Sequence, residues 1–176
     1  EYIDLQVDDS NRESINVEEI CTSLNDNLPP GILINGASVM NGKFPSLQQT
    51  VTSCVWDITV NEDDTKVDSW IDRMNSVNEI VLRRERKGKE VVDDIKPQVH
   101  LVRKNYERID GRVTLQAELG TQPRSLRPSE LLRSIEPCLT EYKLRRRKQI
   151  VEEGGQRLDP LEVAGATPMR SLVGAL

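Results

Sequence analysis

The segment that decides the fold is Cys54–Val77, which reads CVWDITVNEDDTKVDSWIDRMNSV. Apolar and polar residues alternate over residues 54–60, which is typical of a half-buried β-strand. From residue 67 onward the apolar residues recur every three or four positions, the spacing of an amphipathic α-helix. The segment therefore predicts a strand, a polar loop and a helix whose apolar sides pack together.

A similar helix pattern precedes this one in the chain. Residues 17–24 (VEEICTSL) match residues 67–74 (VDSWIDRM) in the positions of their apolar side chains. Asn16 is a suitable N-cap for the first helix, and Glu19 completes a pair that resembles a capping box. Each predicted helix lies between predicted strands. We therefore expect an α+β fold of duplicated strand–helix–strand units, that is, ferredoxin-like modules with helices on one face of an antiparallel sheet.

Weaker patterns supply the remaining elements. The alternation over Val113–Leu119 predicts a half-buried antiparallel strand, and Pro128 suits the first turn of a helix. A polar connection that ends at Asp110 and Gly111 is expected before that strand. Further strands are expected over residues 3–7, 32–40, 80–86, 91–102 and 142–151, with a hairpin turn at 87–89.

The expected organisation is an α+β domain over residues 1–151, divisible into halves 1–50 and 51–151. From residue 152 to residue 176, small residues, Gly and Pro dominate without a period, which predicts a flexible tail. The chain opens inside a strand pattern and without Met, so we expect a piece of a larger protein.

Composition narrows the class of protein. The formal charge of -5 argues against a protein that coats nucleic acid along its whole surface, but it allows a local basic patch. No stretch approaches the roughly 18 apolar residues of a membrane helix, so we expect a soluble protein without membrane contact. Cys21, Cys54 and Cys138 are widely spaced within apolar patterns. They favour buried thiols in a reducing compartment, either the cytoplasm or an organellar stroma or matrix.

No catalytic or metal-binding arrangement is predicted. His100 is the single histidine, which excludes a multi-histidine metal site, and no cysteine spacing fits an iron–sulfur cluster. Asp93 and Asp94 are adjacent in a predicted strand, so their side chains point to opposite faces. The acidic loop at residues 62–64 lacks the pattern of a calcium loop. We expect an enzyme centre, if the parent protein has one, to lie outside this chain.

Two basic clusters are the candidate binding residues. Arginine suits bidentate contact with phosphate, so each cluster is a candidate nucleic-acid-binding site. The alternative is that these residues are solvated and protect strand edges against aggregation. Few aromatic residues are available for stacking on bases, and Tyr106 and Tyr142 are the candidates outside the expected core. The clusters are Arg83, Arg84, Arg86, Lys87 and Lys89, and Arg145, Arg146, Arg147 and Lys148.

Several segments in order resemble the uncharacterised domain of the radical SAM-linked protein family. They are EYIDLQV, LNDNLPPGI, SLQQTV, KGKEVVDDIKPQV and RPSELLRSI, and the resemblance covers roughly residues 1–151. Within the fourth segment, Asp94, Lys96 and Pro97 match the family's pattern, and we expect them to shape a strand edge. The family's N-terminal part is absent, so the resemblance is to a truncated domain.

The resemblance implies a domain that lies C-terminal to a radical SAM enzyme, in some members beside a cobalamin-binding-like segment. The implied role is a non-catalytic accessory domain that positions RNA or a ribonucleoprotein, such as a ribosome-associated substrate. No cofactor is expected in this chain, and an iron–sulfur cluster and S-adenosylmethionine would belong to the parent protein. The alternative is a docking module that recruits a radical SAM partner or a larger assembly through the edge near Pro97 and the tail.

Overall fold

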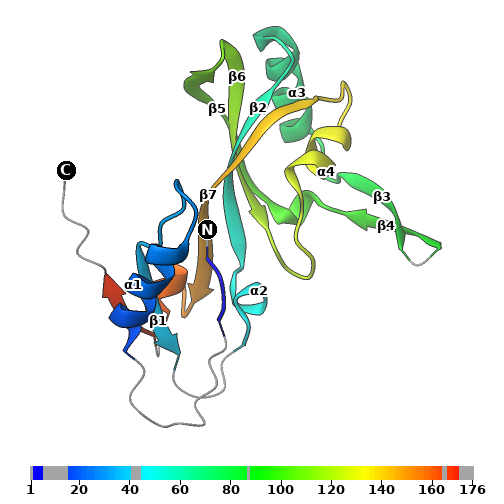
Figure 1. The fold of residues 1–176 in the computed structure, drawn as a ribbon. Coiled ribbons are helices and arrows are strands. Elements are labelled where there is room, and N and C mark those ends of the chain that lie inside the picture. Colours follow the sequence, from blue (N-terminus) through cyan, green and yellow to red (C-terminus); the bar gives the residue numbers. More distant parts are fainter. Residues whose placement is uncertain (1, 6–15, 41–44, 87, 164–165, 171–176) are drawn as a thin grey trace. The chain divides into compact units, whose positions relative to one another are not determined.

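The computed structural model describes residues 2–5, 16–40, 45–86, 88–163 and 166–170 (Figure 1). The chain divides into two compact units. The central unit is Val51–Ile150, and the terminal unit combines the described residues of 2–50 with those of 151–170.

The helices and strands are interleaved along the chain. The helices are α1 (Val17–Asn27), α2 (Leu47–Thr50), α3 (Asp64–Ser76) and α4 (Pro128–Arg133), with short 3-10 helices η1 (Lys96–Gln98) and η2 (Pro160–Glu162). The strands are β1 (Gly36–Met40), β2 (Ser53–Val60), β3 (Val81–Arg86), β4 (Lys89–Asp94), β5 (Val99–Ile109), β6 (Arg112–Gly120), β7 (Glu141–Glu153), β8 (Gln156–Leu158) and β9 (Ala166–Arg170).

The main sheet has the strand order β5-β6-β2-β7-β8, and every neighbouring pair is antiparallel. In the central unit, the apolar residues of β2 and β6 face helices α3 and α4, which Figure 1 shows on the same side of these strands. Asp63 caps α3 by accepting a hydrogen bond from the backbone N–H of Lys66 at 2.9 Å. The fully buried residues of this core include Ile58, Val60, Val67, Trp70, Leu115, Leu131 and Leu132.

The β3–β4 hairpin forms a separate two-stranded sheet whose base joins the core. Ile95 at the end of β4 is completely buried. The Asp94 carboxylate accepts hydrogen bonds from the backbone N–H groups of Ile80 and Lys96, both at 2.9 Å. The Lys96 ammonium donates to the Met74 carbonyl at the end of α3 at 2.6 Å. Two residues of the family-like motif, Asp94 and Lys96, thus fasten the hairpin to the helix, and exposed Pro97 lies in η1.

Strands β5 and β6 form a long hairpin whose tip is the Asp110–Gly111 turn. Both turn residues have positive φ, 52° and 73°, as a tight two-residue hairpin turn requires. Residues 103–109 therefore belong to a strand, and the expected polar connection is wrong at this point. This part of β5 has mostly polar residues on both faces, and even the side chain of Tyr106 is fully exposed. Apolar and polar residues therefore do not alternate along it, and the sequence does not indicate a strand.

The terminal unit contains α1, α2, η2 and the β1–β9 and β7–β8 pairings. Asn16 caps α1 as expected, accepting from the backbone N–H groups of Glu18 and Glu19 at 3.0 and 3.3 Å. The Tyr2 hydroxyl donates to the Asp159 carboxylate, so segments from both ends of the chain meet in this unit. Regular structure continues past residue 152 in β8, η2 and β9, where the sequence predicts a tail; residues 164–165 and 171–176 lie outside the described part.

The α+β class and the antiparallel sheet are confirmed, but the ferredoxin-like duplication is not. Strand β3 after α3 pairs with β4 in a separate hairpin and does not return to the sheet of β2. Strand β1 after α1 pairs with β9. Residues 2–5 form no strand, and residues 6–15 lie outside the described residues. The similar spacing in residues 17–24 and 67–74 reflects only that both helices are amphipathic.

Candidate functional site

The basic cluster on the β3–β4 hairpin is partly matched by a carboxylate. Arg83 lies 3.2 Å from Glu90 across the hairpin, and both side chains are exposed. Lys89 is exposed as well, whereas the side chain of Arg86 and all of Lys87 lie outside the described part of the structure. An exposed pair of this kind contributes little stability, but it lowers the positive charge that the hairpin presents to a phosphate.

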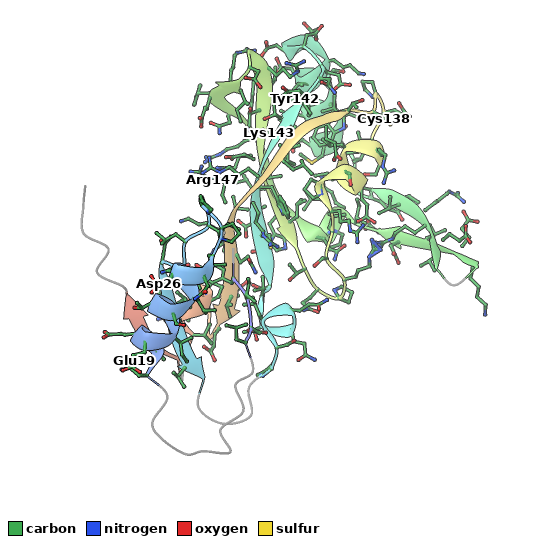
Figure 2. All side chains as sticks on the ribbon, in the orientation of Figure 1. Glu19, Asp26, Cys138, Tyr142, Lys143 and Arg147 are labelled. Carbon is green, nitrogen blue, oxygen red and sulfur yellow. The ribbon has the colours of Figure 1, made fainter. Side chains whose placement is uncertain are left out.

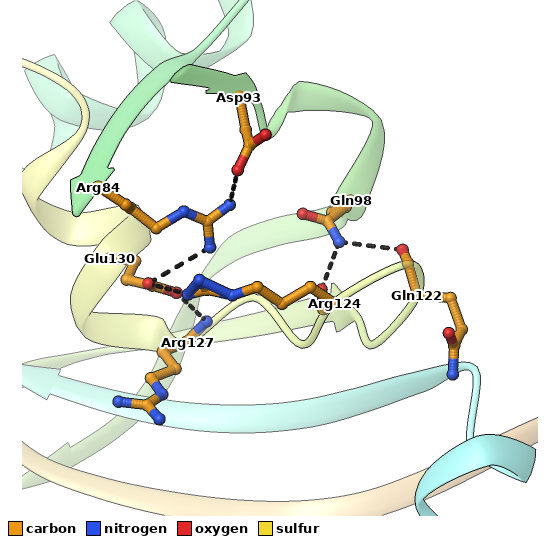
Figure 3. Close-up of polar contacts among 7 residues, drawn as sticks. All are labelled: Arg84, Asp93, Gln98, Gln122, Arg124, Arg127 and Glu130. Carbon is orange, nitrogen blue, oxygen red and sulfur yellow. Dashed lines mark hydrogen bonds and ion pairs between the residues drawn. The ribbon is translucent and has the colours of Figure 1, made fainter. Parts of the chain in front are cut away.

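Arg84 from the same cluster takes part in a network around a buried carboxylate (Figure 3). Glu130 on α4 is only 8% exposed and accepts a hydrogen bond from Arg124. Arg84 lies 3.5 Å from the same carboxylate and also pairs with Asp93 on β4. The backbone N–H of Arg127 donates to the second Glu130 oxygen at 3.0 Å. A buried carboxylate needs such partners, so Arg84 is committed to a structural role.

The same network holds the loop between β6 and α4. The Gln98 amide donates to the backbone carbonyls of Gln122 and Arg124 at 2.9 and 2.6 Å (Figure 3). The backbone N–H of Leu126 donates to Gly120 at 3.0 Å. The loop therefore has a defined path, and the guanidinium of Arg127 is directed away from Glu130 in Figure 3.

The second basic cluster lies on β7, where the strand geometry separates its members. Side chains opposite each other in an antiparallel pair share one face of the sheet. A register shift between Val55 and Trp56 leaves Arg147 as the extra residue of β7, as in a β-bulge. Arg146 is thus on the helix-covered face, and Arg145 and Lys148 are on the opposite face. The register pairs are Arg145 with Asp57, Arg146 with Trp56, and Lys148 with Val55.

Arg147 faces a buried carboxylate on β2. Its Nε lies 3.6 Å from one oxygen of Asp57, which is 6% exposed, and the other Asp57 oxygen has no hydrogen-bond partner among the described residues. Lys143, Arg145 and Lys148 are exposed on β7, and within the described residues none of them forms an ion pair. Figure 2 labels Lys143 and Arg147 along this strand. The β7 cations, defined as Lys143, Arg145, Arg147 and Lys148, therefore carry excess positive charge.

A pocket of about 300 Å³ lies on the helix-covered face, beside Trp56. The Arg146 guanidinium carbon is 5.5 Å from the centre of the Trp56 ring, within the range of a cation–π contact. Burial raises the pKa of the Cys54 thiol in this pocket to about 11, so the thiol is protonated and unreactive at neutral pH. The lining residues are Cys54, Trp56, Leu119, Thr121, Ser125, Leu126, Arg127, Pro128, Ser129, Leu144 and Arg146.

The two tyrosines that the sequence suggests for stacking lie elsewhere. Tyr142 is in contact with Arg112, whose guanidinium carbon is 4.0 Å from the ring centre, and its hydroxyl donates to Asp110 at 3.0 Å. Tyr106 is fully exposed on β5. The alternation over residues 54–60 puts Trp56 on the apolar face of the expected strand, where a core position is predicted. The structure leaves it half-buried in the pocket, and no signal in the alternating pattern distinguishes it from a core residue.

His100 lies beside a hydrogen-bonded pair, Ser53 and Glu118, on the sheet. Its Nδ1 lies 3.5 Å from the Glu118 carboxylate, and the Ser53 hydroxyl donates to the same carboxylate at 2.8 Å. In a serine nucleophile the hydroxyl donates to the histidine, with the carboxylate behind it. Here the carboxylate lies between the two, so this arrangement does not activate Ser53.

The acidic loop at residues 62–64 has structural partners. Glu62 accepts from the backbone N–H of Thr140 at 2.9 Å, and Asp63 caps α3. Hydrogen bonds from Arg108 and Lys104 hold the pKa of Asp64 below its usual value. Each carboxylate of this loop therefore binds the protein itself.

The chain was compared with protein families, curated proteins and solved structures. Residues 1–128 match a family described as an uncharacterized protein conserved in bacteria (DUF2344). This chain belongs to the DUF2344 family. No curated protein and no solved structure matches it. The family description prints no activity, cofactor or partner.

The match to the DUF2344 family ends inside the wall of the pocket. Trp56 and Arg127 lie within the matched residues, whereas α4 beyond Pro128 and the whole of β7 follow them. Arg124 lies within the matched residues, whereas Glu130, which accepts its hydrogen bond, lies outside them. The family model therefore covers one wall of the pocket, and the β7 cations belong to the following segment of this chain.

The described residues of this DUF2344 chain contain no group of three or more His, Cys, Asp or Glu side chains that could hold a metal ion. Cys21, Cys54 and Cys138 are free thiols. These three thiols do not fit the ligand set of an iron–sulfur cluster. Among the helices of the described segments, none has the length and apolar character needed to cross a membrane.

Proposed function

We propose that this chain is a non-catalytic accessory domain that binds RNA through the β7 cations. The observation that carries the proposal is a row of exposed cations in a chain of net charge -5. Of the four β7 cations, only Arg147 faces a carboxylate among the described residues. The hairpin cluster differs because Arg83 and Arg84 both pair with acidic side chains.

The chemistry of these residues suits phosphate. The planar guanidinium of Arg145 can make two parallel hydrogen bonds to phosphate oxygens, and Lys143 and Lys148 add point charges. Binding that neutralises about three phosphates of a single strand should weaken roughly 20-fold between about 50 and 200 mM salt. The proposal therefore includes a strong dependence on salt.

The test compares two matched double variants in a filter-retention assay with single-stranded RNA at low salt. Arg145→Gln with Lys148→Gln removes two exposed charges from β7. Arg83→Gln with Lys89→Gln removes two exposed charges from the hairpin and serves as the control. We expect the β7 variant to bind roughly 10-fold more weakly and the hairpin variant to bind nearly as well as the native chain. No retention of the native chain, or equal losses in both variants, would remove the proposal.

We further propose that the parent protein or a partner is a radical SAM enzyme, which would hold the iron–sulfur cluster and S-adenosylmethionine. This part is supported only by the resemblance of the segments that include KGKEVVDDIKPQV. The sequence of the full-length parent tests it. A CxxxCxxC motif upstream is the expected finding, and a parent and neighbouring genes without such a motif would contradict it.

A second candidate function is docking of a partner protein on the β3–β4 hairpin. Among the described strands, β3 and β4 pair only with each other, so both outer edges are open to a further strand. Val81 and Val92 are also 42% and 53% exposed. Co-purification with a radical SAM partner that survives nuclease and high salt would favour this function. Loss of this co-purification in the double variant Val81→Thr with Val92→Thr would place the contact on the β3–β4 hairpin.

A further inference from the structure

The pocket beside Trp56 has an aromatic ring in its wall, and the Arg146 guanidinium lies over that ring. Trp56 packs partly against the core and is only half-buried, whereas Trp70 is completely buried. An indole is a surface on which a planar ring can stack, and a ligand ring at Trp56 would take the place of the Arg146 guanidinium. The volume of about 300 Å³ lies at the small end of ligand pockets, which suits a single planar ring system.

The charge of the pocket selects an anionic ligand. Its described lining contains two arginines, Arg127 and Arg146, and no carboxylate. The guanidinium groups of Arg84 and Arg124 contact the Glu130 carboxylate. Arg127 contacts it only through its backbone N–H. The Arg127 guanidinium, directed away from Glu130 in Figure 3, makes no ion pair with the described residues. A ligand with one planar ring and one negative group would use both the Trp56 ring and the two arginines of the lining.

The hydroxyl groups of the lining add polar contacts at the ring's edge. Ser125 and Ser129 line the pocket, and each hydroxyl can both donate and accept, whereas the Thr121 hydroxyl donates to the Val51 carbonyl and can only accept from a ligand. Such groups can meet the mixed donors and acceptors of a nucleobase edge. They do not require one particular base, so we expect little preference among bases.

Arg146 connects this pocket to the β7 cations. It is the neighbour of Arg145 and Arg147 in the chain, but it lies on the other face of the sheet. To reach Arg146, an RNA strand held by the β7 cations would pass round the outer edge of β7, whose residues 141–150 pair only with β2 among the described strands. The cation–π contact of Arg146 with Trp56 is modest, and a phosphate offers its guanidinium a stronger, charge-assisted hydrogen bond.

We infer that the pocket takes one unstacked base of a single-stranded RNA, with the base against Trp56 and its phosphate near Arg146 and Arg127. This inference rests on the proposed RNA binding and specifies the form of RNA that is bound. A stacked base in a duplex cannot enter such a pocket, so we expect single-stranded RNA to be preferred over a duplex of the same sequence.

Tryptophan fluorescence tests the inference, because Trp70 is shielded in the core and Trp56 is accessible. The probes are an oligouridine of about eight nucleotides, a size within the range of single-strand binding sites, and an abasic ribose–phosphate chain of the same length. We expect the oligouridine to quench the native emission and the abasic chain to bind without quenching. Trp56→Phe should lose the quenching, and Trp56→Leu should bind the oligouridine about 5- to 100-fold more weakly.

Tyr106→Leu is the matched control, because it removes an exposed aromatic ring outside the pocket. It should bind and quench as the native chain does. If the oligouridine binds the native chain and Trp56→Leu equally and without quenching, the inference fails while the proposed RNA binding stands. If no oligonucleotide binds, the proposed function itself fails. Saturable quenching by uridine monophosphate, without oligouridine binding, would overturn the assignment of the pocket to RNA.

Discussion

Arg146 lies over the indole of Trp56, with 5.5 Å between its guanidinium carbon and the ring centre. The two residues are also register partners in the β2–β7 pair, so the backbone fixes their approach. Through this contact, Arg146 of the basic cluster at residues 145–148 lies against Trp56, which the alternating pattern of β2 places on the apolar face. Arg146 is also one of the two arginines that line the pocket.

The first prediction concerns the stability of that contact. Arg146→Gln should lower the free energy of unfolding by about 0.5–1 kcal/mol, the value of a partly exposed cation–π contact. The loss should shrink when Trp56 is already replaced by Leu, because the ring is then absent. Urea denaturation of both single variants and the double variant measures the coupling. A coupling energy of zero would mean that the contact is not stabilising.

The second prediction concerns Asp57, whose carboxylate is buried beside Arg147. Arg147→Gln leaves a buried charge without its ion-pair partner and should destabilise the chain by about 1–3 kcal/mol. Asp57→Asn removes the charge and should change the stability by less than about 1 kcal/mol. Thermal unfolding of the two variants distinguishes these effects. Equal losses would contradict our account of this pair.

The third prediction compares two carboxylates that each pair with an arginine. Glu130→Gln removes a buried charge that contacts Arg84 and Arg124, so it should cost about 3–5 kcal/mol. Glu90→Gln removes the exposed partner of Arg83 and should cost less than about 1 kcal/mol. Chemical denaturation of both variants provides the values. A small loss for Glu130→Gln would show that the network does not stabilise the loop that forms the pocket wall.

The fourth prediction concerns pH and Glu62. Burial favours the neutral carboxyl, but hydrogen bonds from the backbone N–H of Thr140 and the charge of Lys66 outweigh it, so the pKa of Glu62 is lowered. A lowered pKa stabilises the folded state above the unfolded pKa of about 4.3, and this contribution is lost as pH falls through the folded value. Glu62→Gln should therefore be less stable at neutral pH. The difference from the native chain should disappear in acid, and unfolding at a series of pH values checks this; a constant difference would contradict it.

The sequence predicts the parts of the fold in which one pattern dominates. Strand β2, helix α3 and strand β6 each have a complete apolar face, and each is found close to its expected position. The outer part of β5 and the short strand β8 have no such face, because exposed polar residues occupy both sides. Pairing between distant segments, such as β1 with β9, leaves no local signal at all.

The candidate site was only partly predictable for a related reason. The sequence places Arg145–Lys148 together, but the β-bulge that sends Arg146 and Lys148 to opposite faces depends on the pairing with β2. Trp56 and Trp70 both satisfy the pattern of buried residues. Which of the two tryptophans is completely buried depends on the other elements that pack against it. The loop before α4 leaves a pocket beside Trp56.

The most direct test of RNA binding by the β7 cations is the slope of log affinity against log salt concentration for single-stranded RNA. We predict a slope of about −2 for the native chain, and a slope smaller in magnitude by about 1.4 for Arg145→Gln with Lys148→Gln, because each phosphate contact contributes about 0.7. The Arg83→Gln and Lys89→Gln control should keep the native slope. Equal slopes for the native chain and the β7 variant would contradict the central claim.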